Sequence, residues 1–145
     1  MPDDETTPLL LPRINTATTT TTESKMSSTV FWKIGALYGA SAVAIGAFGA
    51  HGLKKRIADP QKLANWSTAA QYQLVHSVVV LIARDHPIAC GLLTAGMTMF
   101  SGSIYALTLD TDRFRSLGPV TPLGGLCLIA GWLALAFSKG RVGRF

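Results

Sequence analysis

Charged side chains are scarce in this chain. Of its 145 residues, 14% are Asp, Glu, Lys or Arg, whereas 48% are hydrophobic and the mean hydropathy is +0.33. Soluble domains usually carry about 25% charged residues. The deficit excludes most soluble enzymes, disordered regulators and nucleic-acid-binding proteins, and it indicates a membrane protein with a single domain.

The chain also has little cysteine and no motif for a metal. Cys90 and Cys127 each lie in an apolar stretch, without a second cysteine or a histidine at metal-ligand spacing. Helical rise separates them by about 12 Å in membrane depth, which is beyond the reach of a disulfide, so we predict free thiols. The same count separates His51 from His76 by about 15 Å, so we predict no metal site.

Motifs for catalysis and for nucleic-acid binding are missing as well. The chain has no Gly-Xaa-Ser-Xaa-Gly elbow, phosphate-binding loop or His-Glu-Xaa-Xaa-His sequence, and its apolar stretches hold no Asp or Glu. No segment combines dense Lys and Arg with aromatic residues, although the net charge is +5. We therefore expect neither an enzyme nor a nucleic-acid-binding protein, no cofactor, and the lipid bilayer as partner.

Four uncharged apolar stretches are present, at residues 34–50, 66–83, 87–109 and 117–138. Each approaches or exceeds the roughly 20 residues that cross the hydrocarbon layer as a helix. A backbone in lipid must satisfy its own hydrogen bonds, which favours helices. The sequence thus predicts an all-α fold, a four-helix transmembrane bundle over residues 30–138.

Two polar segments flank this membrane domain. Residues 1–29 are rich in Thr and predict a disordered tail, and residues 139–145 form a basic C-terminal tail. The first apolar stretch is longer than a signal-peptide core and follows a long polar lead, which disfavours cleavage. Lys and Arg divide evenly between the two membrane faces, so the charge bias leaves the orientation open.

Small residues recur within three of the four stretches. They allow helix backbones to approach closely in lipid, so we predict a tight bundle. The glycines expected at helix contacts are Gly35, Gly39, Gly46, Gly102, Gly124 and Gly125.

Polar side chains within the stretches are the candidates for a binding site. Counting residues from the links places most of them toward one membrane face, with His76 deeper in the second stretch. They are His51, Tyr72, Gln73, His76, Tyr105 and Thr121. Two interpretations stay open, because such groups either bind a ligand or bond one another and define the packing of the helices. Pro122 likewise indicates either a harmless kink near a helix start or a hinge.

Four ordered motifs carry a resemblance to a known family. They are Gly46-Ala-Phe-Gly-Ala-His-Gly-Leu53, Trp66-Ser-Thr-Ala-Ala-Gln-Tyr-Gln-Leu-Val-His76, Phe100-Ser-Gly-Ser-Ile-Tyr105 and Pro119-Val-Thr-Pro-Leu-Gly-Gly125. Together they resemble the transmembrane protein 256 family, also catalogued as domain of unknown function 423. The resemblance implies a small multi-pass membrane protein of four helices, with no established activity, cofactor or catalytic residue. It also implies an inner-membrane location in bacteria and an association with mitochondria in animals.

The N-terminal tail favours another compartment. It begins with three acidic residues and has one arginine, Arg13, unlike a mitochondrial targeting segment. The run from Glu5 to Leu9 and Leu10 resembles an acidic dileucine sorting signal. We therefore expect endosomal or vacuolar sorting slightly more than the mitochondrial inner membrane.

The sequence leaves two functional hypotheses open. The small-residue surfaces favour a structural or accessory subunit that packs against other membrane proteins or against a second copy of the chain. The alternative is a small carrier or channel that uses the polar cluster of the second stretch around Gln73 and His76.

Overall fold

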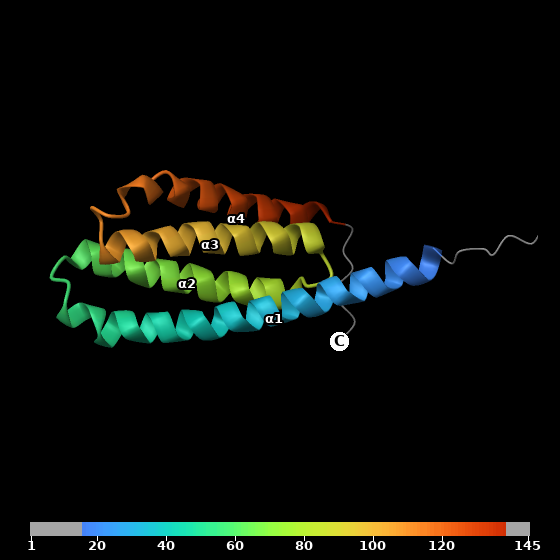
Figure 1. Cartoon of the computed structure of the whole chain (residues 1–145), viewed down its shortest axis with the longest axis horizontal. Helices are drawn as coiled ribbons and strands as arrows, with labels where there is room; N and C mark the ends of the chain where they lie inside the picture. Colours follow the sequence, from blue (N-terminus) through green and yellow to red (C-terminus); the bar gives the residue numbers. More distant parts are fainter. Residues whose placement is uncertain (1–15, 139–145) are drawn as a thin grey trace, which may run out of the picture.

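The computed structural model describes residues 16–138, and all regular structure in that range is helical. The four long helices are α1 (Thr16–His51), α2 (Pro60–Ile82), α3 (Pro87–Leu109) and α4 (Val120–Phe137) (Figure 1). Two short 3-10 helices, η1 (Leu53–Lys55) and η2 (Arg115–Leu117), lie in the links. This confirms the predicted all-α fold of four helices. Residues 5, 9 and 10 of the sorting motif and the basic tail 139–145 lie outside the described range.

Prolines mark the starts of three helices. Pro60 and Pro87 are the first residues of α2 and α3, where a missing N–H group removes no helical hydrogen bond. Asp59 caps α2, since its Oδ1 accepts from the backbone N–H groups of Gln61 at 2.8 Å and Lys62 at 3.4 Å. This cap starts α2 six residues before the predicted stretch. Pro122 is the third residue of α4, a position that tolerates proline without a kink.

The start of α1 differs from the prediction. We expected a disordered tail up to residue 29, but α1 begins at Thr16 and includes the threonine run 18–22. A helix that has already formed adds one hydrogen bond for each further residue without a new nucleus, so the apolar segment can extend into poor helix formers. The 36 residues span about 54 Å, and the N-terminal part of α1 projects beyond the other helices (Figure 1).

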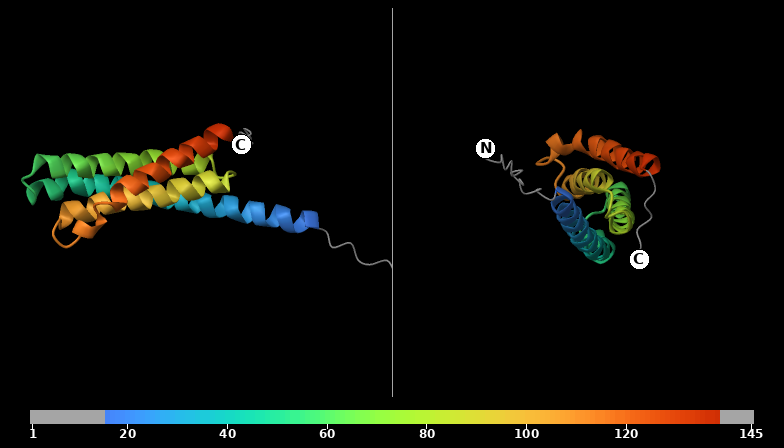
Figure 2. Two further views of the ribbon diagram at one scale, coloured as in Figure 1. Left: turned by 90° about the horizontal axis from the view of Figure 1, so that it is seen from above. Right: turned by 90° about the vertical axis from the view of Figure 1, so that its right-hand side faces the viewer.

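Helices that follow one another in sequence pack against each other in antiparallel pairs. The α1–α2, α2–α3 and α3–α4 pairs form the main contacts, while α1 touches α3 less extensively. Consequently α1 and α4 lie on opposite sides of the α2–α3 pair, and α4 crosses the others obliquely (Figure 2). The α1–α2 and α3–α4 links share one end of the bundle, which we call the link end. The α2–α3 turn lies at the opposite end.

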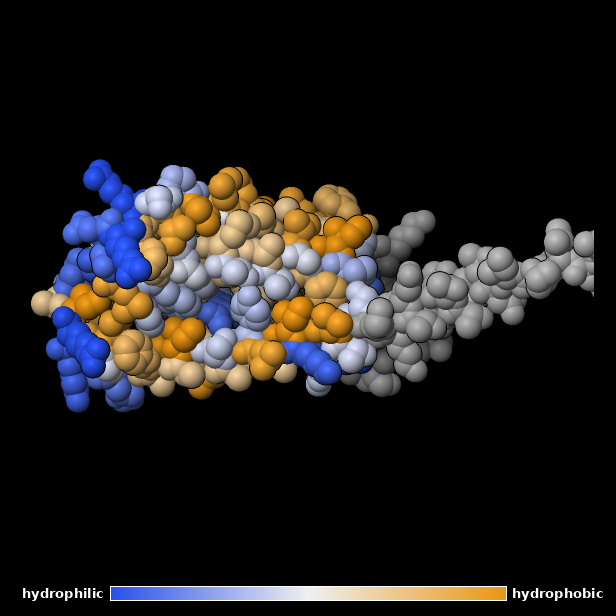
Figure 3. Space-filling view, in the orientation of Figure 1, coloured by the Kyte–Doolittle hydropathy of each residue, from blue (hydrophilic) through white to orange (hydrophobic). Residues whose placement is uncertain are grey.

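Among the described residues, three segments are apolar and long enough to cross a membrane, namely Ser27–Lys55, Pro87–Leu109 and Arg115–Phe137. Helix α2 has the same length as α3 but is more polar. It lies between its neighbours, and its buried face carries Gln73, His76 and Ser77. Hydrophilic side chains gather at the link end, whereas apolar ones cover most of the flank (Figure 3). The chain is therefore a membrane protein in which the most polar helix, α2, buries one polar face against its neighbours.

The apolar core lies between α2, α3 and α4. Val80, Cys90, Leu93, Met97 and Leu128 are almost completely buried in one cluster. Both cysteines are free thiols, as predicted, with Cys90 buried and Cys127 half-buried. The Sγ of Cys90 lies 3.1 Å from the carbonyl oxygen of Ala83, so this thiol also binds the α2–α3 turn.

Three of the six glycines predicted at contacts lie against another helix at very short range. A Cβ atom at Gly35 would lie 2.8 Å from Leu81 Cγ, and one at Gly39 would lie 3.2 Å from Ser77 Oγ. At Gly124 it would lie 2.8 Å from the Cα of Phe100, which is backbone. At Gly124 a side chain would require a helix to shift, whereas at Gly35 and Gly39 the facing side chains of Leu81 and Ser77 would have to move. Gly46 and Gly125 leave ordinary contact distances of 3.8 and 3.9 Å to Ala70 and Phe100.

Gly102 does not pack against another helix of this chain, contrary to the prediction. It lies on the exposed side of α3, and a Cβ atom there would meet nothing within 4 Å. Three further glycines make such contacts: Gly49 lies against Trp66, Gly96 against Leu128 and Gly131 against Leu93. Sequence spacing alone does not show which side of a membrane helix is inward, because both sides are apolar.

Candidate functional site

Gln73 is the centre of a hydrogen-bond network between α1, α2 and α3. Its Nε2 donates to the carbonyl oxygen of Tyr38 at 3.0 Å and to Ser41 Oγ at 2.8 Å. Its Oε1 accepts from the hydroxyl of Tyr105 at 3.1 Å. The side chain is only 4% exposed, so its polar atoms are satisfied inside the bundle as burial requires. The structure thus joins two predicted site residues, Gln73 and Tyr105.

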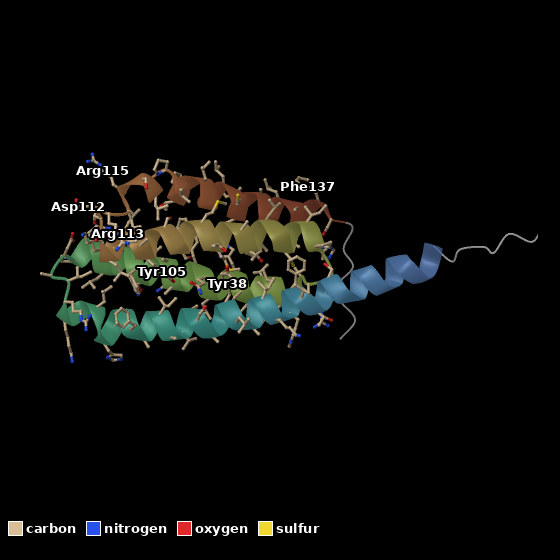
Figure 4. All side chains as sticks on the ribbon, viewed as in Figure 1. Tyr38, Tyr105, Asp112, Arg113, Arg115 and Phe137 are labelled. Atoms are coloured by element: carbon tan, nitrogen blue, oxygen red, sulfur yellow. The ribbon has the colours of Figure 1, made fainter. Side chains whose placement is uncertain are left out.

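Tyr38 extends this network to a further helix contact. Its hydroxyl lies 2.5 Å from Thr98 Oγ1 on α3, while its carbonyl accepts from Gln73 on α2. Figure 4 shows the Tyr38 and Tyr105 labels on the same flank of the bundle. One tyrosine therefore contacts two neighbouring helices, through its side chain and its backbone.

An aromatic group lies on the link side of Gln73. The indole of Trp66 is 4.7 Å from the ring of Tyr105 and 5.9 Å from that of Phe48, measured between centroids. Its Nε1 donates to the carbonyl oxygen of Ile45 at 2.9 Å, and the residue is 5% exposed. Since α2 starts at Pro60, Trp66 lies more than a turn into this helix, on its buried face.

His76 forms a second cluster, on the side of α2 nearer to α4. Its Nδ1 lies 2.6 Å from the carbonyl oxygen of Tyr72, and its Nε2 lies 3.1 Å from Nε1 of Trp132. A carbonyl only accepts and an indole N–H only donates, so Nδ1 carries the proton and Nε2 accepts. Tyr72, which is 46% exposed, places its ring 5.6 Å from His76 and 5.0 Å from Phe100.

Thr121 belongs to a third, smaller contact between α3 and α4. Its Oγ1 lies 2.7 Å from the hydroxyl of Ser103, which also lies 3.0 Å from the carbonyl oxygen of Phe100. Ser101, two residues earlier, donates to the carbonyl oxygen of Ala69 on α2 at 2.9 Å. Hydroxyl groups on α3 therefore bond this helix to both α2 and α4.

His51 is not brought to any of these clusters. It is exposed at the end of α1, and its side chain makes no hydrogen bond to the described residues. The predicted candidates thus separate into the Gln73 group, the His76 group and the Thr121 contact, with His51 apart. The described part of the chain holds no group of three His, Cys, Asp or Glu side chains that could bind a metal ion.

Three important members of these networks were absent from the sequence prediction. Tyr38, Ser41 and Trp132 supply the partners of Gln73 and His76. Tyr38 and Ser41 lie one turn apart on α1, opposite Gln73, and that spacing is the only signal that could have indicated them. Trp132 has no such signal, since its pairing with His76 depends on how α4 crosses the bundle.

Chemically, these networks hold helices together. Both ring nitrogens of His76 and both polar atoms of the Gln73 amide have partners within the chain. Among the side chains of residues 27–138, the only buried nitrogen or oxygen without a partner is Oγ1 of Thr94. The arrangement contains neither a nucleophile beside a base nor a buried carboxylate.

The family described as "Protein of unknown function (DUF423)" matches residues 45–125. A UPF0382 membrane protein of the fission yeast Schizosaccharomyces pombe is 41% identical over 113 residues, which cover 72% of this chain and 96% of the relative. UPF0382 membrane proteins of Staphylococcus epidermidis and Bacillus subtilis are 41% and 38% identical, over 75% and 73% of this chain and 93% and 92% of theirs. No solved structure matches the chain.

Proposed function

The chain belongs to the DUF423 family of membrane proteins, as its four motifs predicted, and on this premise we propose that it is a non-enzymatic accessory subunit. In this role it packs in the bilayer against helices of another membrane protein. One observation carries the proposal, namely an outward face of small residues on α3 that is largely exposed, apart from the contact of Tyr38 on α1 with Thr98.

This face consists of Gly91, Ala95, Thr98 and Gly102, which recur at intervals of four, three and four residues and so lie on one side of the helix. The last three are exposed, and a Cβ atom at either glycine would meet nothing within 4 Å. Small residues allow a second backbone to approach closely, and such contacts drive helix association in lipid. The face therefore has the composition of a helix-docking surface.

The carrier alternative has weaker support. A transport route needs polar groups that are free to exchange partners with a substrate. The amide of Gln73 and the ring of His76 instead bond to Tyr38, Ser41 and Trp132, and this favours a role in packing. Flux into proteoliposomes tests the alternative directly. Flux that disappears in Gln73→Ala and His76→Ala would establish a carrier and contradict our proposal.

Purification in mild detergent tests the accessory role. A stoichiometric partner protein should copurify with the full chain from its native membrane. Gly102→Leu should lose that partner, because the leucine side chain covers the face of small residues. Ala44→Leu is the matched control, because Ala44 is exposed on α1 away from this face. The proposal is wrong if the chain is recovered only alone or with copies of itself, or if Gly102→Leu retains the partner.

For the compartment we propose endosomal or vacuolar membrane over the mitochondrial inner membrane. The support is the acidic dileucine run with Glu5, Leu9 and Leu10, together with the acidic start of the tail. Imaging of the tagged chain should place it in endosomes or vacuoles, and Leu9→Ala with Leu10→Ala should disperse it. If the wild type and the double variant both localise to mitochondria, this assignment is wrong.

A further inference from the structure

A groove of about 730 Å³ runs between α1 and α2 on the outer side of their contact. Its walls are mostly small and apolar, with Ala47 and Ala50 on α1 and Ala64 on α2 among the exposed lining residues. The indole of Trp66 lines it as well, held there by its contact with Gly49. The two helices therefore contact each other on their inner sides, while their small outer side chains leave the groove open.

The length and position of the groove match one leaflet of a bilayer. Its α1 wall extends from Ala42 to Ala50 and its α2 wall from Leu63 to Leu74, which are about 12 and 17 Å of helical rise. Half of the hydrocarbon thickness is about 15 Å. Since Ala50 and Leu63 lie near the link end, the groove runs from the membrane surface to the middle of the bilayer.

The mouth of the groove is basic. Lys54 lines it, and Lys55 and Arg56 follow in the same link, all three exposed. At the link end as a whole, basic side chains outnumber acidic ones. The basic residues are Lys54, Lys55, Arg56, Lys62, Arg113 and Arg115, and the acidic ones are Asp59, Asp110 and Asp112. Figure 4 shows three of these residues at that end. Asp59 is already engaged in capping α2, so its charge is partly satisfied there.

We infer that this groove binds a phospholipid with an anionic headgroup. The headgroup phosphate pairs with Lys54 at the mouth, and one acyl chain lies along the alanines below it. Basic residues beside transmembrane helices attract anionic lipids in this way. The groove has the length of one leaflet and a lysine at its mouth, which matches a lipid with its headgroup at the surface and an acyl chain below it.

Native mass spectrometry of the full chain in detergent tests the inference, with dioleoylphosphatidylglycerol and dioleoylphosphatidylcholine as probes. The wild-type chain should retain one phosphatidylglycerol several-fold more than phosphatidylcholine. Lys54→Gln should abolish this preference. Ala47→Leu should reduce retention of both lipids, since the larger side chain fills the groove from an exposed position.

Two matched variants serve as controls. Arg115→Gln removes a positive charge at the same end but outside the groove, and Ala44→Leu adds the same bulk to an exposed position of α1 that does not line it. Both should bind lipid like the wild type. Equal retention of the two lipids by the wild type overturns the inference, as does Ala47→Leu that binds like Ala44→Leu. A dimer that Ala47→Leu dissociates would assign the groove to a second copy instead.

Discussion

The indole N–H of Trp132 on α4 donates to Nε2 of His76 on α2 across 3.1 Å. The opposite ring nitrogen of His76 is fixed by the carbonyl oxygen of Tyr72, one turn earlier on the same helix. Because α4 packs chiefly on α3, this bond is a polar link between helices that are not neighbours in the sequence. The bond therefore constrains the position of α4 relative to α2.

Removal of this bond should weaken the attachment of α4. We expect Trp132→Phe to lower the free energy of unfolding in bicelles by about 1 to 2 kcal/mol, since His76 loses its donor. A double-mutant cycle with His76→Ala should give a coupling energy of about 0.6 to 1.7 kcal/mol. Trp32→Phe is the control, because Trp32 contacts Arg84 and lies apart from His76. Additive effects of Trp132→Phe and His76→Ala would show that the bond contributes nothing.

Neighbouring glycines of α4 should respond in opposite ways to one methyl group. Gly124→Ala places its Cβ 2.8 Å from the Cα of Phe100, and a backbone atom cannot move aside without shifting a helix. We expect a loss of about 1 to 3 kcal/mol in the free energy of unfolding. Gly125→Ala has 3.9 Å to the Phe100 ring and should be neutral or stabilising by up to about 1 kcal/mol. Equal effects in an unfolding assay would contradict the described contact between α3 and α4.

Two glutamines of α2 offer a second matched pair. Gln73→Leu removes bonds to Tyr38, Ser41 and Tyr105 and should destabilise the protein by about 1 to 3 kcal/mol. Gln71→Leu changes an exposed residue and should leave stability unchanged or raise it slightly. Thermal unfolding in a lipid bicelle distinguishes them. A Gln73→Leu protein as stable as the wild type would mean that the network does not hold α1 to α2 and α3.

The two thiols should differ in reactivity. Both should react with N-ethylmaleimide after denaturation without a reductant, because neither is in a disulfide. In the folded protein Cys90 should react several-fold more slowly than the half-buried Cys127, since it is buried and bonded to the carbonyl of Ala83. Peptide mapping by mass spectrometry measures both rates. Faster labelling of Cys90 would contradict the core packing of the α2–α3 turn.

Part of the candidate site followed from residue counting. Gln73 and Tyr105 were placed at similar depth in adjacent stretches, and they do meet. The same counting put His51 near them, but depth says nothing about direction around a helix, and His51 is exposed elsewhere. Trp132 was missed because its link to His76 requires the oblique path of α4, which no local pattern encodes.

The sequence by itself determined the helices and their order. No charged residue lies within the four apolar stretches, so these stretches must form helices, and short links require antiparallel neighbours. Only the tertiary structure decided which side of each helix is inward. In water, polar residues would mark the outer side, whereas lipid is as apolar as the core and removes that signal. Gly102 and Gly124 therefore look alike in sequence, yet one faces outward and the other touches the backbone of α3.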